Sequence, residues 1–524
     1  MTITAPMSIT APMSLDCALL RKFRRPDRGV RAPSCRLANY GPGAVARLFR
    51  LAAAASGLWA VTGQAADART ALRTFFAFER EIWQETAGSR LALQTPKKHP
   101  DNPVIARGDG QAADSHRLSY TSLFPEEGKL RAWYTAMKKG GSYKDHAVGY
   151  AESADGVSWI KPKLNLVEPG TNLLLRGPIT FVVTPDDTGR EKSYRALAGF
   201  FRADVGTPAA RGESGATFKV LTSKDGLRWD FDAQPATTVR HFEAYGLFHR
   251  NRQWWVLGQG VSPYFHLPDG REHGRVMYGF HSADGANWDL YPKPLFHYPI
   301  NAYFREASLQ NHMGAAVWDR GRVLIGLMGQ FWPAGFSAGV RMTIGLTYSY
   351  DGIDWTEPFA QTPQVKPGPA GAWDSGCVIF VQRPVSRGDS TYVYYSGFDG
   401  GNEWSSRAAI GLATLRRDGF AALAPEQENV RLVTKSVSLL AGETTLYLNS
   451  RGAVTVQVLD EYLRPLGSPQ AISGDGVRTP TLNVKELNRA SPFHLAFTLQ
   501  TGAELYSFSF GPDPDKLGRL ENWE

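Results

Sequence analysis

A short phrase that recurs along the chain constrains its fold more than any other feature. The phrase has the pattern Ser-x-Asp-Gly-x-x-Trp, and its full copies span residues 153–159, 223–229, 282–288 and 349–355. A shorter copy, Arg417-Asp-Gly-Phe420, follows them. The aspartates lie 70, 59, 67 and 67 residues apart, a period that suits a four-stranded unit with its loops. The sequence therefore predicts five copies of one structural unit.

Segments typical of β-strands precede each copy. They are rich in Val, Ile, Tyr and Trp, as in residues 148–152 and 277–281. Asp-Gly between two strands predicts a tight turn, in which Gly adopts a positive φ and the Asp side chain caps backbone N–H groups. The repeated aspartates are therefore predicted to be structural. Five antiparallel four-stranded units around one axis make a five-bladed β-propeller.

The repeat stops after Pro425, and the pattern of the chain then changes. Further short strands, such as residues 454–459 and 505–510, are separated by Gly, Pro and Asn and predict a β-sandwich. The predicted fold class is all-β, a five-bladed β-propeller with a C-terminal β-sandwich. The expected parts are a leader and signal peptide (1–66), an N-terminal linker (67–94), the propeller (95–430), the sandwich (436–511) and a tail (512–524).

The net charge of +8 resides almost entirely in the leader. Residues 1–66 hold nine Lys or Arg and two acidic residues, so the remainder is close to neutral and lacks the basic footprint of a nucleic-acid-binding protein. Arg47 and Arg50 precede an apolar run, residues 51–61, and small residues follow it, as in a signal peptide. The run is too short to span a bilayer. We expect a periplasmic or secreted protein without a membrane span.

Cysteine usage excludes internal disulfides in the exported chain. Cys17 and Cys35 lie in the leader, so Cys377 alone would remain. It sits in an apolar run, where we expect a small buried residue without chemistry.

Any chemistry is expected on the face opposite the Asp-Gly turns. In a four-stranded meander the first and third turns share one face, so the second turn and the connection into the next unit share the other. These loops carry aromatic and histidine side chains, which suit stacking on sugar rings and hydrogen bonding to hydroxyl groups. Ordinary solvated loops with incidental aromatics are the alternative.

Acidic residues occupy the connections into several units. Hydrolysis of a glycosidic bond needs one protonated and one ionised carboxyl group. We predict Glu243 as the acid, Asp101 as base or nucleophile, and Asp187 as a third catalytic residue that tunes the acid or holds hydroxyl groups. For each acid, a turn cap or a surface charge is the alternative. The predicted substrate-binding residues are Asp374, His312, Glu306, Arg305, Trp332, Trp404 and His146.

Four motifs carry a family resemblance over residues 95–430. They are His99-Pro-Asp-Asn-Pro-Val104, Trp133-Tyr134, the run from Gly149 to Gly156, and Tyr394-Tyr395-Ser-Gly397. With them the chain resembles the five-bladed propeller glycosidases of glycoside hydrolase families 32, 43, 62, 68 and 130, and more closely family-32-like relatives. The resemblance implies an Asp of the first blade, an Asp of the second and a Glu of the third, which map onto Asp101, Asp187 and Glu243. The characteristic motifs of family 32 invertases do not occur, so fructoside activity is not implied.

The leading interpretation is an exported glycoside hydrolase acting on a poly- or oligosaccharide. A glycoside phosphorylase of the family 130 type is one alternative, with Arg305, His312 and Arg341 as a basic pocket for phosphate. A non-catalytic glycan-binding propeller is another, and it would lack a pair of acids. No cofactor or metal is predicted, and carbohydrate is the expected partner. The sugar, the anomer, the stereochemical course and the oligomeric state stay open.

Overall fold

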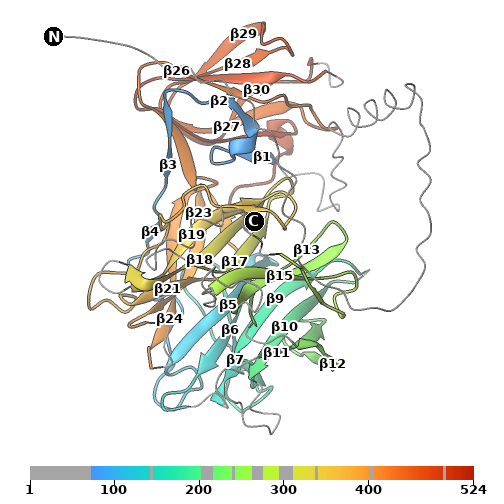
Figure 1. Ribbon diagram of the computed structural model, residues 1–524, viewed down its shortest axis with the longest axis vertical. Helices are drawn as coiled ribbons and strands as arrows, with labels where there is room; N and C mark the ends of the chain where they lie inside the picture. Colours follow the sequence, from blue (N-terminus) through green and yellow to red (C-terminus); the bar gives the residue numbers. More distant parts are fainter. Residues whose placement is uncertain are drawn as a thin grey trace, which may run out of the picture. The chain divides into compact units, whose positions relative to one another are not determined.

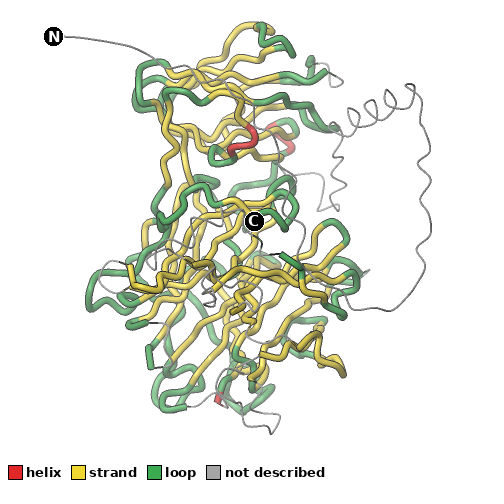
Figure 2. Tube along the Cα trace, viewed as in Figure 1, coloured by secondary structure: helices red, strands yellow, loops and turns green. Residues whose placement is uncertain are grey.

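The computed structural model describes residues 72–141, 145–189, 191–201, 216–238, 242–261, 275–293, 295, 311–336, 340–401, 405–487 and 491–524. The expected leader and signal peptide lie outside these ranges. Within them the protein is all-β, as predicted, and helix is confined to short turns such as η1 (Arg80–Ile82) and η5 (Pro514–Lys516) (Figures 1 and 2). No helix in the described part is long and apolar enough to cross a bilayer.

Three four-stranded antiparallel sheets follow one another along the chain, each pairing its strands in sequence order. Their strands are β9 (Thr180–Asp186), β10 (Ser193–Phe201), β11 (Ala216–Ser223) and β12 (Asp230–Thr238); β13 (Phe242–Arg250), β14 (Gln253–Val261), β15 (Arg275–Ser282) and β16 (Asp289–Leu290); β17 (Asn311–Asp319), β18 (Leu324–Phe336), β19 (Val340–Ser349) and β20 (Trp355–Thr356).

A nine-stranded sheet combines the strands before and after these three sheets. One half is a meander of β5 (Arg117–Glu126), β6 (Lys129–Met137), β7 (Ala147–Ser153) and β8 (Leu173–Arg176). The other half contains β21 (Cys377–Phe380), β22 (Val385–Arg387), β23 (Ser390–Phe398) and β24 (Ala408–Arg416), with β4 (Lys97–Lys98) on the far side of β24. Two parallel pairs join the halves: Ala408 with Arg117, and Ser122 with Gln382.

The Asp-Gly turns have the geometry that the sequence predicted. In each full copy the aspartate Oδ1 accepts hydrogen bonds of 2.7 to 2.8 Å from the backbone N–H groups two and three residues later. The serine hydroxyl accepts from the glycine N–H group, and the glycine has a positive φ of 72° to 84°. The structural role of these aspartates is confirmed.

Each Asp-Gly turn also accepts a contact from another repeated unit. Arg131 on β6 donates to the carbonyl oxygen of Asp225 at 2.6 Å, and Arg195 on β10 donates to that of Gly285 at 3.0 Å. Arg250 on β13 donates to Tyr350, beside the fourth aspartate, at 3.2 Å. Arg320, after β17, forms an ion pair with Asp418 at 3.0 Å.

The fifth contact returns to the first turn. Tyr394 on β23 donates its hydroxyl hydrogen to the carbonyl oxygen of Gly156 at 2.6 Å, and both groups are buried. The five contacts therefore link the repeated units in chain order and connect the last unit to the first. Buried backbone carbonyls need a partner, so the turns and their neighbours depend on each other.

Two further sheets form a β-sandwich. One contains β1 (Arg73–Phe76), β3 (Ser89–Leu93), β25 (Ala421–Pro425), β27 (Thr445–Arg451), β30 (Asp475–Asn483) and β32 (Glu504–Gly511); the other contains β2 (Trp83–Glu85), β26 (Val430–Thr434), β28 (Val454–Leu459), β29 (Pro465–Ile472) and β31 (His494–Leu499). The two sheets bury one shared hydrophobic cluster that includes Trp83, Val456, Phe497 and Phe508, as packed sheets do.

The ends of the sandwich differ from the expected boundaries. Residues 73–93, within the expected linker, supply β1, β2 and β3, and β25 and β26 lie before residue 436. The tail also packs: the backbone of Glu524 pairs with that of Ser386, and Trp523 contacts Tyr392 with ring centroids 5.1 Å apart. The strands β1, β2 and β3 pair with strands that lie several hundred residues later in the chain. A local sequence pattern does not predict such pairing.

Replacement of Gly156 tests the packing of the first turn. Gly156 and Gly128 share a φ of +80°, but an added Cβ at Gly156 would meet Trp523 at 2.7 Å and Tyr394 at 2.8 Å, while one at Gly128 meets nothing within 4 Å. We expect Gly128→Ala to cost about 1 kcal/mol from the left-handed backbone alone. Gly156→Ala should cost about 1–3 kcal/mol more because of overpacking. Urea unfolding measures both; equal losses would contradict the tight contact.

The stability of the protein should fall in acid partly through Asp155. Burial raises the pKa of Asp155, but hydrogen bonds from Ser158 and Val157 outweigh it and lower the pKa to about 2. A carboxyl group with a depressed pKa in the folded state stabilises the fold above its unfolded pKa and loses that contribution as the pH falls toward 2. Asp155→Asn keeps Oδ1 but does not titrate. Its stability should depend less on pH between about 5 and 2 than that of the wild type, and identical pH profiles would be the opposite result.

Candidate functional site

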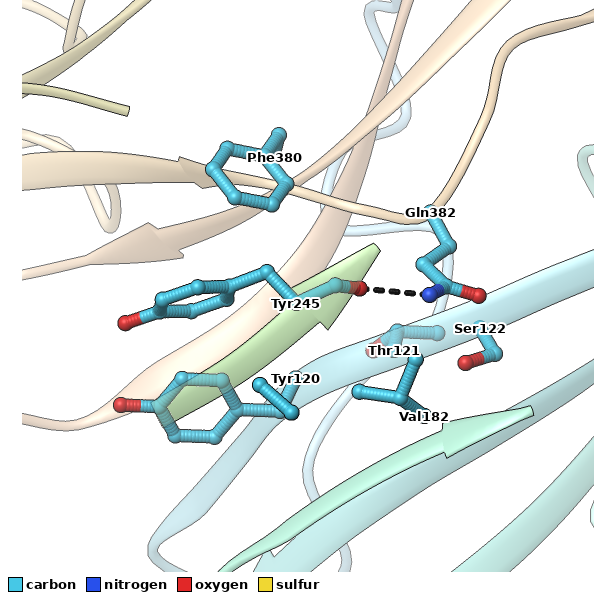
Figure 3. Close-up of a pocket in the computed structure, with 8 residues that line it drawn as sticks. Tyr120, Thr121, Ser122, Val182, Tyr245, Phe380 and Gln382 are labelled. Carbon is cyan, nitrogen blue, oxygen red and sulfur yellow. Dashed lines mark hydrogen bonds between the residues drawn. The ribbon is translucent and has the colours of Figure 1, made fainter. Parts of the chain in front are cut away.

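The first strands of several units meet in one place. Residues of β5, β9 and β13, together with Phe380 of β21 and the following Gln382, line a common space (Figure 3). Gln382 ties them together, because its backbone N–H donates to Thr121 at 2.8 Å and its side chain donates to the carbonyl of Tyr245 at 2.5 Å. The enclosed space measures only about 10 Å³, which is room for about one water molecule.

Glu243 lies near the amino end of β13 and is half-buried. Its Oε2 atom accepts one hydrogen bond from the Tyr245 hydroxyl group and one from Gln259 Nε2, each at 2.6 Å. Tyr245 also lines the shared space and packs against Phe380, with ring centroids 5.2 Å apart. The carboxyl group is thus held in a fixed orientation through one oxygen, while the side chain keeps partial exposure.

Arg117 brings a positive charge to the same end of the strands. It is the first residue of β5, is buried, and lies over the Phe398 ring at 4.6 Å. Burial lowers the pKa of Arg117, and nearby Tyr120, Cys377 and Glu243 oppose this shift. The guanidinium group therefore lies in the electrostatic field of Glu243. An arginine beside a carboxyl group can orient it or attract an anionic group of a ligand.

Cys377 begins β21 next to this cluster and has no accessible surface. Burial raises the pKa of its thiol to about 12, with Arg117 opposing. The thiolate is the nucleophilic form of cysteine, so Cys377 is unsuited to nucleophilic catalysis at neutral pH. The prediction of a small buried residue is confirmed.

Asp101 lies away from the first strands. Its side chain is 76% exposed, and its neighbours His99 and Asn102 hydrogen-bond to Leu412 of β24. The segment therefore continues the strand β4 along the edge of that sheet. Asp101 therefore does not stand at the beginning of an inner strand, as was expected, because the first strand of this unit is β5, which begins only at Arg117.

Asp187 lies at the wrong end of its sheet for the predicted role. It is exposed and follows β9, whose last residue is Asp186. Asp186 accepts hydrogen bonds from Thr188 and from Arg195, which also contacts the turn at Gly285. Asp187 thus belongs to the face of the Asp-Gly turns, whereas Glu243 stands at the start of its strand. The sequence placed Asp187 before the strand because the boundary of β9 was not evident.

Asp374 has a structural environment. It is buried, and its Oδ2 accepts from Lys98 Nζ at 2.5 Å and from the Tyr395 hydroxyl at 2.9 Å. Burial and the neighbouring Asp374 raise the pKa of Tyr395, so the phenol acts as the donor. Lys98 and Tyr395 already bind the carboxylate of Asp374, for which we predicted a role in substrate binding.

The same arrangement recurs before β5, where sequence reasoning missed it. Asp114 is buried and accepts from Lys161 Nζ at 2.6 Å and from the Tyr134 hydroxyl at 3.0 Å. Gly108 and Gly368 each precede their aspartate by six residues, and a Cβ at either would collide with the carboxylate. Both segments have the spacing Gly-x5-Asp-Ser, and this shared pattern could have revealed the role of Asp114 from the sequence. Its repetition indicates that Asp374 supports the fold.

Some of the remaining predicted binding residues are buried, and others lie outside the described part of the protein. Trp332 is 4% exposed and donates its indole N–H to Thr343 at 3.0 Å, so its ring does not face solvent. His146 is buried just before β7, and His312 belongs to β17. Arg305, Glu306 and Trp404 lie outside the described residues. Within the described ranges, no hydrogen bond joins Glu243 to a second carboxyl group.

Comparisons with known proteins find distant structural likenesses. No protein-family model matches the sequence, and no curated protein matches it. A solved structure described as a glycoside hydrolase has 15% identity and a TM-score of 0.43, covering 62% of this chain and 92% of its own.

Two other solved structures come from different glycosidase families. A family 43 arabinoxylan arabinofuranohydrolase from Bacillus subtilis has 12% identity and a TM-score of 0.37, covering 80% of this chain and 99% of its own. A structure titled for the GH130 family of mannoside phosphorylases, with hydrolases that target linkages in Candida mannan, has 14% identity and a TM-score of 0.40, covering 62% of this chain and 94% of its own. Likenesses at this level do not assign a family.

Removal of the Asp374 charge tests its structural role. Asp374→Asn leaves Lys98 without its partner in a largely buried setting, and breaking such pairs is costly. We expect a loss of about 2–4 kcal/mol in the free energy of unfolding. Asp101→Asn is the matched control, because Asp101 is exposed and should change stability by less than about 0.5 kcal/mol. Chemical denaturation of both variants gives the answer, and a neutral Asp374→Asn would show that the pair does not support the fold.

Proposed function

We propose that the chain is an exported glycan-active enzyme of the glycoside hydrolase type, built on a five-bladed β-propeller, with Glu243 as its catalytic acid. The position and hydrogen bonds of Glu243 carry this proposal. The side chain stands at the start of a first strand, is oriented by Tyr245 and Gln259, and lies in the field of Arg117. A carboxyl group held in this way can donate a proton to a glycosidic oxygen or accept one from an attacking water.

The propeller assignment rests on the repeat and its contacts. The nine-stranded sheet would count as two blades joined by the Ala408–Arg117 pair. The other three sheets would be one blade each, and the five turn contacts would join neighbouring blades in a ring. Such an arrangement protects sheet edges. It would bring the first strands to a common axis, with Glu243 at one mouth.

A second carboxyl group is needed for hydrolysis, and we propose Glu306 for it. Glu306 precedes β17, and β17 packs closely on β13: a Cβ on Gly246 would meet the carbonyl of Ala315 at 2.2 Å, and one on Gly314 would meet Tyr245 at 2.7 Å. In the chain, Glu306 is the acidic residue that leads into β17. This assignment replaces those of Asp101 and Asp187.

A catalytically silent glycan-binding propeller is the second candidate. The observation in its favour is that, among the described residues, Glu243 has no carboxyl partner. Export is a further part of the proposal, supported by the leader, in which two arginines precede an apolar run and small residues.

Glycan release from a panel of polysaccharides and aryl glycosides tests the function. We expect Glu243→Gln and Glu306→Gln to lower the rate by about 10²-fold or more, because each removes a proton-transfer group. Asp101→Asn and Asp187→Asn serve as matched acid-to-amide controls and should stay within about twofold, since neither lies at the Glu243 end of the strands. Thermal unfolding confirms that each variant is folded.

The outcomes separate the candidates. Full activity in Glu243→Gln would contradict the assignment of the acid. Cleavage that requires added inorganic phosphate would indicate a phosphorylase. Binding without cleavage by the wild type on every substrate would favour the silent glycan-binding protein.

A further inference from the structure

A group of arginines lies at the opposite end of the first strands from Glu243. Arg250 ends β13, seven residues after Glu243, which is about 23 Å along an extended strand. Its Nη1 atom pairs with Asp319, the last residue of β17, at 2.9 Å. This end of the strands is therefore separate from the proposed catalytic mouth.

The neighbouring arginines also have carboxylate partners. Arg320 pairs with Asp418 at 3.0 Å through Nη1, and its Nη2 atom bonds to the same carboxylate at 3.1 Å. Arg322 pairs with the fully buried Glu79. Buried guanidinium groups in proteins normally have such partners because desolvation of an unpaired charge is costly.

Arg383 departs from this rule. It follows Gln382 at the end of the segment that begins with β21, and its Nε atom is buried without a hydrogen-bond partner. In the described part of the protein its guanidinium contacts the ring of Phe124 at 5.0 Å and takes part in no ion pair. Its nearest charges are Arg320, which repels it, and Asp319. Asp319 already accepts from Arg250 and from the N–H group of Gly321.

The charge and backbone of Arg383 are both unusual. Burial, and then Arg320, lower its pKa to about 10, with Asp319 opposing, so the group is still a cation at neutral pH. Its φ is +46°, a left-handed conformation that is disfavoured for a residue other than Gly, and Pro384 follows it. Strained residues of this kind tend to occur at binding and active sites.

We propose that this end of the first strands binds an oxyanion and that the guanidinium group of Arg383 is its direct ligand. The planar fork of arginine matches a carboxylate, phosphate or sulfate through two parallel hydrogen bonds. Arg383 as a whole residue is partly exposed, although its Nε atom is buried. Arg320 has both Nη atoms on Asp418 and contributes only its positive field. A bound oxyanion would supply the negative charge for an ion pair with Arg383, which no carboxylate of the described residues forms.

Isothermal titration calorimetry of the full chain with inorganic phosphate tests the proposal, at constant ionic strength maintained with chloride. Wild type should bind phosphate, and thermal unfolding should shift upward with phosphate concentration. Arg383→Met keeps an apolar side chain over Phe124 and should weaken binding at least about tenfold. Arg383→Lys keeps the charge without the fork and should also bind more weakly. Arg228→Met is the control, because Arg228 is exposed on an Asp-Gly turn and pairs with Asp225.

A parallel titration with D-glucuronate separates two sources of the same chemistry. Tighter binding of phosphate would assign the site to a free inorganic oxyanion, and tighter binding of glucuronate would assign it to an acidic sugar; both support an oxyanion site. Absence of binding of either by the wild type would overturn the proposal. Binding that Arg383→Met and Arg383→Lys retain at wild-type strength would overturn it as well.

Discussion

The Asp-Gly turn is the interaction on which the rest of the structure depends. Because the aspartate and serine side chains satisfy the N–H groups inside each turn, its backbone carbonyls are available to a neighbouring sheet. Arg131, Arg195, Arg250 and Tyr394 use those carbonyls. The conformation of each turn therefore helps to hold the next repeated unit in place beside it.

The local part of this design could be read from the sequence. The period of the phrase predicted the strands and turns because Asp, Gly and Trp act within seven residues of each other. Glu243 was placed correctly on the entry to β13. Asp101 was not, since its position depends on the pairing of β4 with β24 more than 300 residues later. The prediction for Asp187 was wrong because Asp187 follows β9 instead of preceding it, which puts it on the face of the Asp-Gly turns.

Charged groups at the two ends of the first strands have different environments. At one end Glu243 is oriented by neutral donors, Tyr245 and Gln259, beside the buried Arg117. At the other end arginines predominate, each with a carboxylate except Arg383. Asp374, which sequence reasoning placed in the site, instead holds strands together through Lys98 and Tyr395, whereas Asp101 and Asp187 are exposed. Burial with a complete set of partners distinguishes a structural acid from a reactive one.

A crystal structure of Glu243→Gln with an oligosaccharide bound would locate the sugar and show how the sheets are arranged. We expect five four-stranded units in a ring and a sugar ring within hydrogen-bond distance of residue 243, at the amino end of β13. A sugar bound on the sandwich or on the face of the Asp-Gly turns, or sheets that do not close into a ring, would contradict this expectation.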